Sequence, residues 1–485
     1  MSAFSCAYIL KLTFICIIIF PIKAKELFQL AKNKFEIDMV NGTIMNKMVS
    51  FALPLMLSGI LQLLFNAVDI IVVGRFSGSQ SLAAVGSTSS LINMLTNLFI
   101  GISLGANVLA ARFYAAGRHK EMSETVHTAI FTAFLSGVIM IFVGIFFSRP
   151  ALELMDTPSD VIELATLYMR IYFVGMPFFM LYNYGAAILR AVGDTKRPLI
   201  FLIISGVVNA CLNLLLVIEF KMDVAGVAIA TVISQMISCV LVLICLYKTD
   251  SVYQLRFKKL KIKWEYLGQI FKIGIPAGIQ STLISFSNVL LQSSVNSFGS
   301  IAMAGYTAAN NILSFLYMGA NSITQACMSF TSQNYGARKP KRMDRVLVDG
   351  LILQLVVCLS LGTFAYIFGN EVSSIYTDDP NVIKCSVEIL ALTTIPYFLC
   401  GFMDTFPGVL RGMGRSTVPM ILCLLGTVGM RIVWIYGFFP HNRTLRYLFI
   451  SYPASWIATI VLQLVYYIFI RKRVHKELNS TESFI

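Results

Sequence analysis

The sequence predicts an all-α integral membrane protein with twelve transmembrane helices in two pseudo-symmetric six-helix bundles. Of its 485 residues, 57% are hydrophobic and only 13% are charged, which is about half the charged fraction of a soluble domain. The apolar residues occur in runs of about 20 or more, the length that a helix needs to cross the hydrocarbon of a bilayer. The second half of the chain also repeats the first, at an offset of 221 or 222 residues.

Twelve long apolar segments follow residue 46. The first six cover about 48–74, 82–111, 124–147, 160–189, 197–217 and 224–247. The second six cover about 269–298, 302–332, 344–368, 383–410, 417–438 and 445–470. The longest polar stretch, KTDSVYQLRFKKLKIKWEY, lies between the two sets. We therefore expect a first lobe over 39–247, a cytoplasmic loop over 248–268, a second lobe over 269–472 and a cytoplasmic tail over 473–485.

The first spans of the two halves align without a gap. FALPLMLSGILQLLFNAVD (51–69) matches IGIPAGIQSTLISFSNVLL (273–291), so that Pro54 and Asn66 recur 222 positions later. The segment 111–122 recurs at an offset of 221 as SQNYGARKPKRM. Each repeat holds six spans, an even number, so both halves start on the same side of the membrane. The pseudo-two-fold axis is then expected to lie along the membrane normal.

A half-polar phrase closes the fourth span of each half, as ILRAVGDTKRP (188–198) and VLRGMGRSTVP (409–419). The arginine in each phrase suits both a helix C-terminus and a cytoplasmic face. Gly193 and Gly414 can take the left-handed conformation that ends a helix. Asp194 or Thr195 in the first phrase, and Ser416 or Thr417 in the second, can cap the next helix, with a proline in its first turn. We interpret both phrases as turn and topology devices rather than as substrate sites.

The distribution of Lys and Arg predicts the orientation in the membrane. One set of alternate gaps is rich in these residues and the opposite set holds few. The rich gaps contain Arg112, Arg118, Lys120, Arg190, Lys196, Arg197, Lys248, Arg256, Lys258, Lys259, Lys261, Lys263, Arg338, Lys339, Lys341, Arg342, Arg345, Arg411 and Arg415. We expect a bacterial inner membrane with both ends of the twelve-helix unit in the cytoplasm. This topology accounts for the formal net charge of +14 without any binding of nucleic acid.

Residues 1–38 form an N-terminal extension whose role the sequence leaves open. Residues 3–22 are apolar apart from Lys11. A signal peptide is disfavoured, because positive charge belongs before the apolar run and no A-x-A cleavage site follows. Two interpretations stand: an extra helix, or translation from an upstream start with Met39 or Met45 as the conventional first residue.

Asp69 is an ionisable residue inside the first span, where a charge without a partner or water is costly. It is either a structural carboxylate near the interface or a site for H⁺ or Na⁺, since desolvation can bring a carboxyl group to titrate near physiological pH. Its counterpart in the second half is Leu291, so any coupling chemistry would be asymmetric. Asn209 and Asn213 share one face of the fifth span. With Thr231 of the sixth span they form either an ion site around Asp69 or hydrogen bonds between helices.

Other polar residues at membrane depth are candidates for a substrate cavity. They are Asn66, Asn288, Gln292, Asp404, Arg431 and Arg170. Asp404 and Arg431 could pair inside the second bundle, or each could face the cavity. Pro54 is a candidate hinge in the first span. Further prolines in or near spans, which can kink helices, are Pro177, Pro276 and Pro396.

The sequence does not indicate an enzyme. Its four histidines form no cluster with Asp or Glu that suits a metal, and no phosphate-binding GxxxxGK[ST] motif occurs. The ten cysteines are scattered, mostly inside apolar runs, without metal-ligand spacing. We expect no cofactor and no metal site, apart from Na⁺ if Asp69 binds it. Without a nucleotide site, an ion gradient is the simplest source of energy.

These segments together resemble the MATE family (multidrug and toxic compound extrusion), bacterial type. The resemblance covers residues 39–472. It rests on the FALPL opening, LFNAVDIIVVG in the first span, GANVLAARFYAAG with its partner SQNYGARK, the doubled LRxxGxxxxP, and AGVAIATVISQ in the sixth span. The resemblance implies two six-helix lobes around a V-shaped cleft. It also implies H⁺- or Na⁺-coupled antiport of cationic, amphipathic drugs by alternating access.

The resemblance assigns the central coupling role to Asp69 and places Asn209, Asn213 and Thr231 at the family's fifth- and sixth-span positions. Asn213 departs from the family pattern, because an amide stands where the family has a second carboxylate. The seventh span, FKIGIPAGIQSTLISFSNVLLQ, also lacks the Glu that some members carry there. This second departure argues against a cation site of that kind in the second lobe and places the weight of ion coupling on Asp69.

We therefore expect a monomeric exporter of small organic cations that contacts membrane lipid. In this hypothesis, H⁺ or Na⁺ at Asp69 alters the first helix, with bending at Pro54, and weakens substrate binding in the outward-open state. The alternative is a flippase for a lipid-linked saccharide, since relatives of the fold move such lipids; Arg170 and Arg431 keep it open. A membrane-embedded enzyme or sensor would need a catalytic cluster that the sequence lacks.

Overall fold

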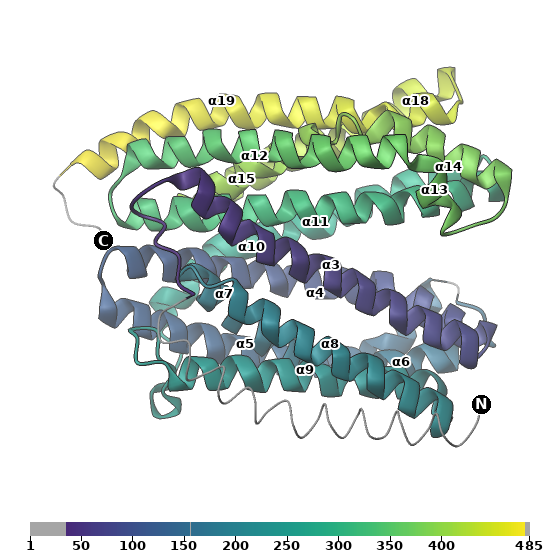
Figure 1. The fold of residues 1–485 in the computed structure, drawn as a ribbon, viewed down its shortest axis with the longest axis horizontal. Helices are drawn as coiled ribbons and strands as arrows, with labels where there is room; N and C mark the ends of the chain where they lie inside the picture. The colour runs from purple at the N-terminus through teal and green to yellow at the C-terminus, as the bar shows by residue number, and fades with distance from the viewer. Residues whose placement is uncertain (1–34, 156, 481–485) are drawn as a thin grey trace. The chain divides into compact units, whose positions relative to one another are not determined.

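A computed structural model describes residues 35–155 and 157–480 (Figure 1). The regular elements in this part of the chain are helices, and no strand occurs in it. Residues 1–34 of the predicted extension and residues 481–485 of the predicted tail lie outside the described residues. The two interpretations of the extension therefore stay predictions.

The first half contains α3 (Ile44–Phe76), α4 (Ser79–Ala115), α5 (His119–Leu154), α6 (Ile162–Val174), α7 (Met176–Ala191), α8 (Lys196–Leu214), the π-helical η2 (Leu215–Glu219) and α9 (Asp223–Lys248). The connection to the second half includes the short η3 (Phe257–Lys259). The second half contains α10 (Trp264–Asn296), α11 (Ser300–Gly336), α12 (Pro340–Ile367), α13 (Gly369–Ser374), α14 (Pro380–Thr393), α15 (Tyr397–Gly412), α16 (Thr417–Cys423), η4 (Leu424–Gly429), α17 (Met430–Val433), η5 (Trp434–Phe438), η6 (Phe439–His441), α18 (Leu445–Phe449) and α19 (Ser451–Asn479).

Nine of the described helices are long and apolar enough to cross a membrane, and the number rises to eleven if two bent pairs each form one span. The pairs α6–α7 and α14–α15 bend by 47° and 52°. The bends fall at the start of the second helix of each pair, where Pro177 is the second residue of α7 and Pro396 directly precedes α15. The predicted kinks are thus present at these two prolines, whereas α3 and α10 continue through Pro54 and Pro276.

The predicted eighth span is α11, which has 37 residues but is not among the eleven apolar spans. It packs against α12, α14 and α15. Its buried polar side chains include Ser329, Thr331, Ser332, Gln333 and Asn334. Small and polar residues are common where membrane helices pack against each other, because these faces do not meet lipid. With α11, the described residues account for the twelve predicted spans.

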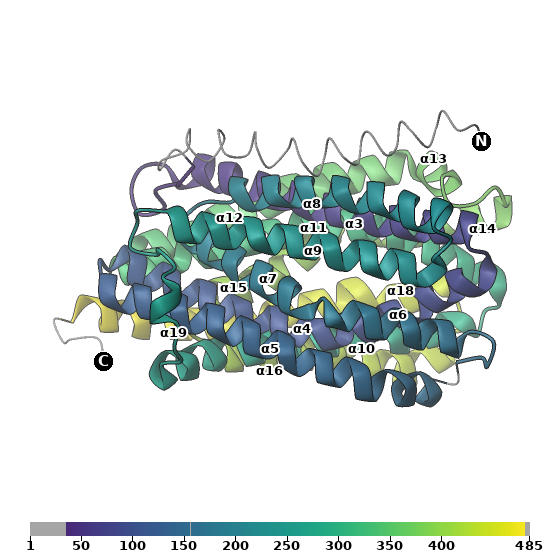
Figure 2. The same cartoon turned by 90° about the horizontal axis from the view of Figure 1, so that it is seen from below.

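The chain forms two compact units, each of which is described by itself. Among the described residues, unit 1 comprises 35–37, 57–110 and 118–270. Unit 2 comprises residues 38–56, 111–117 and 271–480. In unit 1, α5 packs against α6 and α7, and α9 packs against α6, α7 and α8 (Figure 2). In unit 2, α15 packs against α11, α12 and α19.

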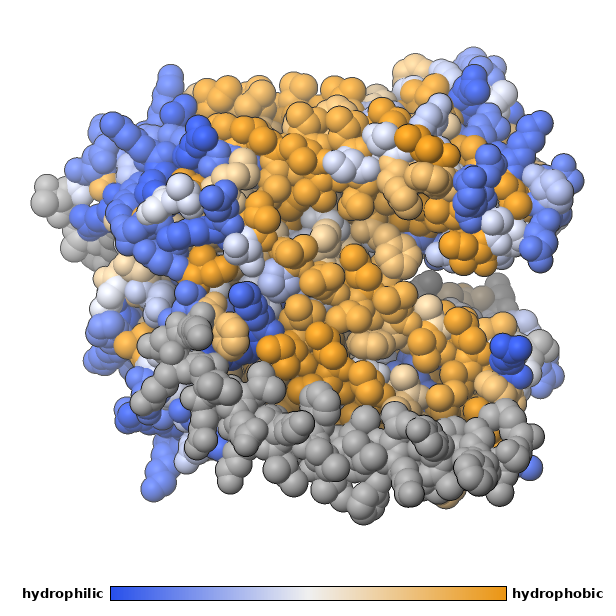
Figure 3. Space-filling view, in the orientation of Figure 1, coloured by the Kyte–Doolittle hydropathy of each residue, from blue (hydrophilic) through white to orange (hydrophobic). Residues whose placement is uncertain are grey.

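The surface of the helices has the polarity that a membrane requires. On the face shown in Figure 3, hydrophobic residues cover the middle of the helices and hydrophilic residues gather at their ends. Exposed apolar side chains include Phe146 at 66%, Val461 at 54% and Phe469 at 82% exposure. Such side chains are expected to face lipid rather than water.

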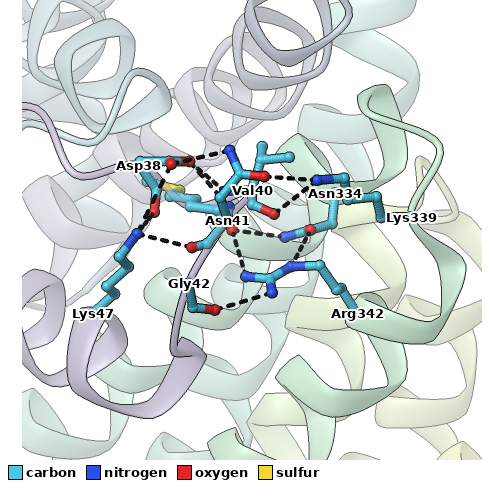
Figure 4. A network of polar contacts seen from close by, with 9 residues as sticks. Asp38, Val40, Asn41, Gly42, Lys47, Asn334, Lys339 and Arg342 are labelled. Atoms are coloured by element: carbon cyan, nitrogen blue, oxygen red, sulfur yellow. Dashed lines mark hydrogen bonds and ion pairs between the residues drawn. The ribbon is translucent and has the colours of Figure 1, made fainter.

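A network of polar contacts holds the segment 38–42, which precedes α3, within unit 2 (Figure 4). Lys339 donates to the carbonyl oxygen of Val40 (3.2 Å) and to the side-chain oxygen of Asn41 (2.9 Å). Arg342, on α12, donates to the carbonyl oxygen of Gly42 (3.0 Å). These cations provide hydrogen bonds for backbone carbonyl groups that lie outside any helix. They thereby hold the segment that leads into α3 in place.

The two repeated phrases form the predicted helix ends. Gly193 has φ 98° and Gly414 has φ 79°, which is the left-handed region expected of both. The N–H of Asp194 donates to the carbonyl oxygen of Leu189 (2.9 Å), and the second phrase repeats this contact from Arg415. The structure therefore confirms that each phrase ends one helix and starts the next.

The caps of the following helices differ between the two copies. The Asp194 carboxylate accepts hydrogen bonds from the N–H groups of Lys196 and Arg197, both at 3.1 Å, as predicted. In the second copy the predicted side-chain cap at Ser416 or Thr417 is wrong. Ser416 occupies the cap position but donates its hydroxyl to the carbonyl oxygen of Ile273 (2.7 Å) instead.

Candidate functional site

Asp69 is buried on α3 in unit 1, with 8% of its surface exposed. The side-chain amide of Asn213, on α8, donates a hydrogen bond to one oxygen of its carboxylate. The hydroxyl of Thr231, on α9, also faces this carboxylate. Side chains from three helices therefore meet at one buried acidic group.

Asn209 completes a chain of polar contacts in unit 1. Its amide oxygen accepts from Asn213 (3.2 Å), and its amide nitrogen donates to the hydroxyl of Thr231 (3.4 Å). The hydroxyl of Thr231 donates in turn to the carbonyl oxygen of Val227 (2.9 Å). The structure thus brings together the four residues that the sequence predicts as an ion-coupling group: Asp69, Asn209, Asn213 and Thr231. It does not test their role.

The helix that carries Asn209 and Asn213 changes its geometry directly after the cluster. The regular part of α8 ends at Leu214, and the chain continues as the π-helical turn η2. A π-helical turn is wider than an α-helical one and often marks a functional site. The widening here lies next to Asn213, the residue that holds the carboxylate of Asp69.

The partners of Asp69 in the described part of the chain are neutral, and no ion pair there includes it. Two oxygens near the cluster, Oδ1 of Asn213 and Oε1 of Gln235, are buried without a hydrogen-bond partner among the described residues. Carboxylate, amide and hydroxyl oxygens are the ligands that hard cations prefer. A carboxylate with this surrounding can take up either a proton or a small cation. No cluster of three or more His, Cys, Asp or Glu side chains suited to a metal occurs among the described residues.

Sequence reasoning missed two tyrosines beside the cluster. Tyr168 and Tyr172 lie one turn apart on α6, with ring centroids 6.1 Å apart. Both phenol groups lie close enough to Asp69 for electrostatic interaction with its carboxylate. Their spacing of four residues in the fourth span was the available signal, since such residues share a helix face.

The charged candidates of the second half form a different arrangement. Arg431 is buried in unit 2, with 3% exposure, and donates to the side-chain oxygens of Asn288 (2.8 Å) and Ser287 (3.4 Å). Its guanidinium carbon lies 4.4 Å from the centre of the Tyr452 ring. Asp404 is half-buried on α15, and no ion pair joins it to Arg431 in the described structure.

The remaining cavity candidates do not join either cluster. Asn66 is exposed on α3, and Arg170 is exposed on α6. Gln292, on α10, donates to the side-chain oxygen of Asn296 (2.9 Å). Their assignment to a substrate cavity stays a prediction.

Comparison with known proteins finds relatives that match nearly the whole chain. The MatE family model matches residues 54–215 and again residues 276–436, so both halves match the same model. The chain is 30% identical over 442 residues to the probable multidrug resistance protein YoeA of Bacillus subtilis, covering 89% of this chain and 95% of that protein. It is 24% identical over 395 residues to the multidrug export protein MepA of Staphylococcus aureus, covering 81% and 87%.

Solved structures share the fold. An outward-facing multidrug resistance MATE family transporter of the MOP superfamily matches with a TM-score of 0.85 and 21% identity, over 90% of this chain and 98% of that one. A MOP superfamily transporter from Pyrococcus furiosus, described as having a binding pocket of reverse polarity, matches with a TM-score of 0.83 and 22% identity, over 91% and 98%.

The helical fold, the membrane-length spans and these matches define an integral membrane transporter and not an enzyme. More specifically, the chain belongs to the MATE family. This confirms the resemblance inferred from the sequence motifs.

Proposed function

We propose that this protein is a secondary active antiporter that exports cationic, amphipathic compounds in exchange for H⁺ or Na⁺, by alternating access of its two lobes. The observation that carries the proposal is the buried carboxylate of Asp69, held by Asn213 and surrounded by neutral partners. The descriptions of YoeA and MepA as multidrug resistance and export proteins support the class of substrate.

Asp69 acts in this proposal as the group that takes up the coupling ion. A buried carboxylate without a positive partner is costly, and either H⁺ or Na⁺ relieves that cost. Protonation also turns a group that only accepts hydrogen bonds into a donor, which changes its contacts with Asn213 and Thr231. These contacts join α3 to α8 and α9. Binding or release of the ion at Asp69 therefore changes how α3 packs against these two helices.

Pro54 is the proposed bending point of α3. A proline inside a helix removes one backbone hydrogen bond and weakens the helix at that position. Bending there, once Asp69 binds its ion, weakens substrate binding in the outward-open state. We place the protein in a bacterial inner membrane with both ends cytoplasmic, on the distribution of Lys and Arg. We propose that it works as a monomer and without a cofactor.

Uptake of a fluorescent organic cation into everted membrane vesicles tests the proposal. An acidic vesicle interior and a Na⁺-loaded interior would be imposed separately. Wild type is expected to respond to one of these gradients, and Asp69→Asn is expected to lose that response. Asp404→Asn is the matched control, because it makes the same change at a carboxyl group of unit 2. It is expected to keep the ratio of uptake with and without the gradient.

Two results would contradict the proposal. Gradient-driven uptake by Asp69→Asn at the wild-type ratio would show that Asp69 is not the coupling group. If wild type takes up no cation under either gradient, the cargo is of another class. Translocation of a fluorescent lipid-linked saccharide in proteoliposomes would then decide in favour of the flippase.

A further inference from the structure

Unit 1 contains a cavity of about 670 Å³ that does not include any residue of the Asp69 cluster. It lies where the loop 249–263, between α9 and α10, meets the first turns of α5. Six lysine or arginine side chains and a single carboxylate line it. They are Lys120, Arg256, Lys258, Lys259, Lys261 and Lys263, with Glu124 as the carboxylate.

Two side chains of α5 fix the wall of this cavity. His127 is buried at 3% exposure. Its Nδ1 lies 2.6 Å from the carbonyl oxygen of Ser123 and donates to it, because a carbonyl group can only accept. Its Nε2 then accepts from the backbone N–H of Arg256 (3.0 Å). The hydroxyl of Thr128 accepts from the backbone N–H of Lys263 (3.2 Å). Both ends of the cationic segment 256–263 are thereby attached to α5.

The first part of the same loop is held in place by buried side chains and by hydrogen bonds. Tyr253 and Leu255 are fully buried. The backbone N–H of Leu255 donates to the carbonyl oxygen of Leu246 (2.9 Å), and the hydroxyl of Tyr253 donates to the carboxylate of Glu36 (2.7 Å). The loop is therefore a packed element, with its apolar side chains inside and its cations at the cavity.

The charge of the cavity is unbalanced. Glu124 pairs with Lys263 (3.5 Å), and the lining contains no second carboxylate for the other five cations. The N-terminal end of α5 adds to this field, because His119 and Ser123 also line the cavity and a helix N-terminus carries partial positive charge. Cations that converge on one space are stabilised when an anion occupies it.

Exposed aromatic side chains that follow or precede the lining lysines in the chain indicate the source of the anion. Trp264 is 77% exposed, and Phe257 is 55% exposed. The Phe257 ring lies 5.6 Å from the ring of Tyr247, which is also exposed. Exposed aromatic rings next to lysines are typical of the membrane interface, and basic pockets at that level bind the phosphate groups of anionic lipids.

We propose that this cavity binds the phosphate-bearing headgroup of an anionic membrane lipid. Lys258, Lys259 and Lys261 supply the charge, and Trp264 and Phe257 lie at the boundary with the acyl chains. The alternative is that the lysines serve only to set the membrane topology, for which their charge is enough. That role does not require the charges to line one cavity, whose wall is held in place by His127 and Thr128. The proposal depends neither on the coupling ion nor on the transported compound.

Lipid binding to the purified full-length protein in a neutral detergent tests the inference. The probes are dioctanoyl-phosphatidylglycerol, dioctanoyl-phosphatidylcholine, inorganic phosphate and sn-glycerol 3-phosphate, each titrated by calorimetry. Wild type is expected to bind the phosphatidylglycerol at least 10-fold more tightly than the phosphatidylcholine. The triple variant Lys258→Gln, Lys259→Gln, Lys261→Gln is expected to lose roughly 10- to 100-fold of that affinity.

Two further triple variants serve as controls. Replacement of Lys258, Lys259 and Lys261 by Arg keeps the charge and is expected to keep the affinity. The variant Lys472→Gln, Arg473→Gln, Lys476→Gln makes the same change of charge on α19, at residues that do not line the cavity, and is expected to change the affinity less than about 2-fold. If the triple loop variant does not fold, Lys259→Gln alone is expected to weaken binding several-fold.

Three outcomes would overturn the inference. Equal losses in the loop and tail variants would show that lipid binding follows total charge and not the cavity. Unchanged affinity in the folded loop variants would exclude these lysines from binding. Inorganic phosphate or sn-glycerol 3-phosphate binding as tightly as the phosphatidylglycerol would show that the ligand is a free phosphate compound and not a lipid.

Discussion

In each half of this transporter a buried charged residue connects the first and fifth spans, but the two charges have opposite signs. In the first half, Asp69 on the first span accepts a hydrogen bond from Asn213 on the fifth span. In the second half, Arg431 on the equivalent of the fifth span donates to Asn288 on the equivalent of the first (2.8 Å). Both halves therefore have a polar contact between these two helices. In the first half the charge is negative and lies on the first span, whereas in the second half it is positive and lies on the equivalent of the fifth span.

This difference shows that the internal repeat preserves packing more closely than chemistry. The position of Asp69 holds Leu291 in the second half, and Leu291 is fully buried in the apolar core of unit 2. An arginine stays charged throughout the physiological range, whereas a carboxyl group can exchange a proton. Under the proposed function, ion coupling would therefore belong to Asp69 in the first half, while Arg431 contributes a constant positive charge in the second.

The largest expected effect compares the two asparagines that hold the two charges. Asn213→Leu removes the donor to Asp69; a hydrogen bond to a charged group is worth about 1.5 to 3 kcal/mol, so gradient-driven uptake is expected to fall at least ~10-fold. Asn288→Leu removes the acceptor for Arg431 and is the matched control. It is expected to keep the ratio of uptake with and without the gradient in everted vesicles. Equal loss of that ratio in both variants would refute the asymmetry.

The second comparison concerns the two repeated turns. A Cβ added at Gly193 would lie 2.5 Å from the backbone oxygen of Ile37, and at Gly414 it would lie 2.6 Å from a guanidinium nitrogen at the end of the Arg112 side chain. Both glycines have positive φ, which costs an alanine about 1 to 2 kcal/mol. Gly193→Ala is expected to cost about 1 to 3 kcal/mol more than Gly414→Ala, because backbone must move. Thermal unfolding in detergent measures this, and the reverse order would show that the turns are not limited by these contacts.

The third comparison concerns the starts of α5 and α12. Arg342 in the second half occupies the position that is equivalent to Glu121 in the first half. Arg342 holds the segment 38–42 through the carbonyl oxygen of Gly42. Glu121 only pairs with its neighbour Arg118 (2.8 Å) at the surface. Arg342→Ala is expected to lower stability by about 1 to 3 kcal/mol, and Glu121→Ala by less than about 1 kcal/mol. Melting temperatures in one detergent give both values, and similar losses would mean that the network in Figure 4 adds no stability.

The smallest expected effect is a difference in pH dependence between two aspartates outside the spans. Burial raises the pKa of Asp194 to about 6, despite the opposing effect of Arg197. Burial also acts on Asp38, but hydrogen bonds from Asn41 and Val40, with the charge of Lys47, leave its pKa below the usual value. Asp194 therefore stabilises the fold at low pH and loses this contribution as the pH rises through about 6. Asp38 stabilises the fold above the usual carboxyl pKa and loses its contribution as the pH falls.

Melting temperatures between pH 4 and 7 distinguish these two signs. Asp194→Asn is expected to flatten the decrease in melting temperature between pH 4 and 6 by about 1 to 2 °C. Asp38→Asn is expected to leave the slope above pH 4.5 unchanged, because the carboxyl group of Asp38 is already ionised there. A flattened slope in Asp38→Asn but not in Asp194→Asn would reverse the assignment.

The sequence by itself determined the features that depend on neighbouring residues. Apolar runs predicted the spans, Pro177 and Pro396 predicted the kinks, and Gly193 and Gly414 predicted the left-handed turns. These features follow from hydrophobicity and from backbone sterics, which act within a few residues. Asp69 and its neighbours Asn209, Asn213 and Thr231 were also found from the sequence, with the help of the family resemblance.

Only the tertiary structure decided which side chains meet. It brought Arg431 to Asn288 instead of Asp404, placed Tyr168 near Asp69, and brought the lysines of the loop 249–263 against α5. Such contacts depend on how each helix is rotated and packed against partners far away in the chain. Hydropathy and spacing do not encode that rotation, because several faces of a membrane helix are equally apolar.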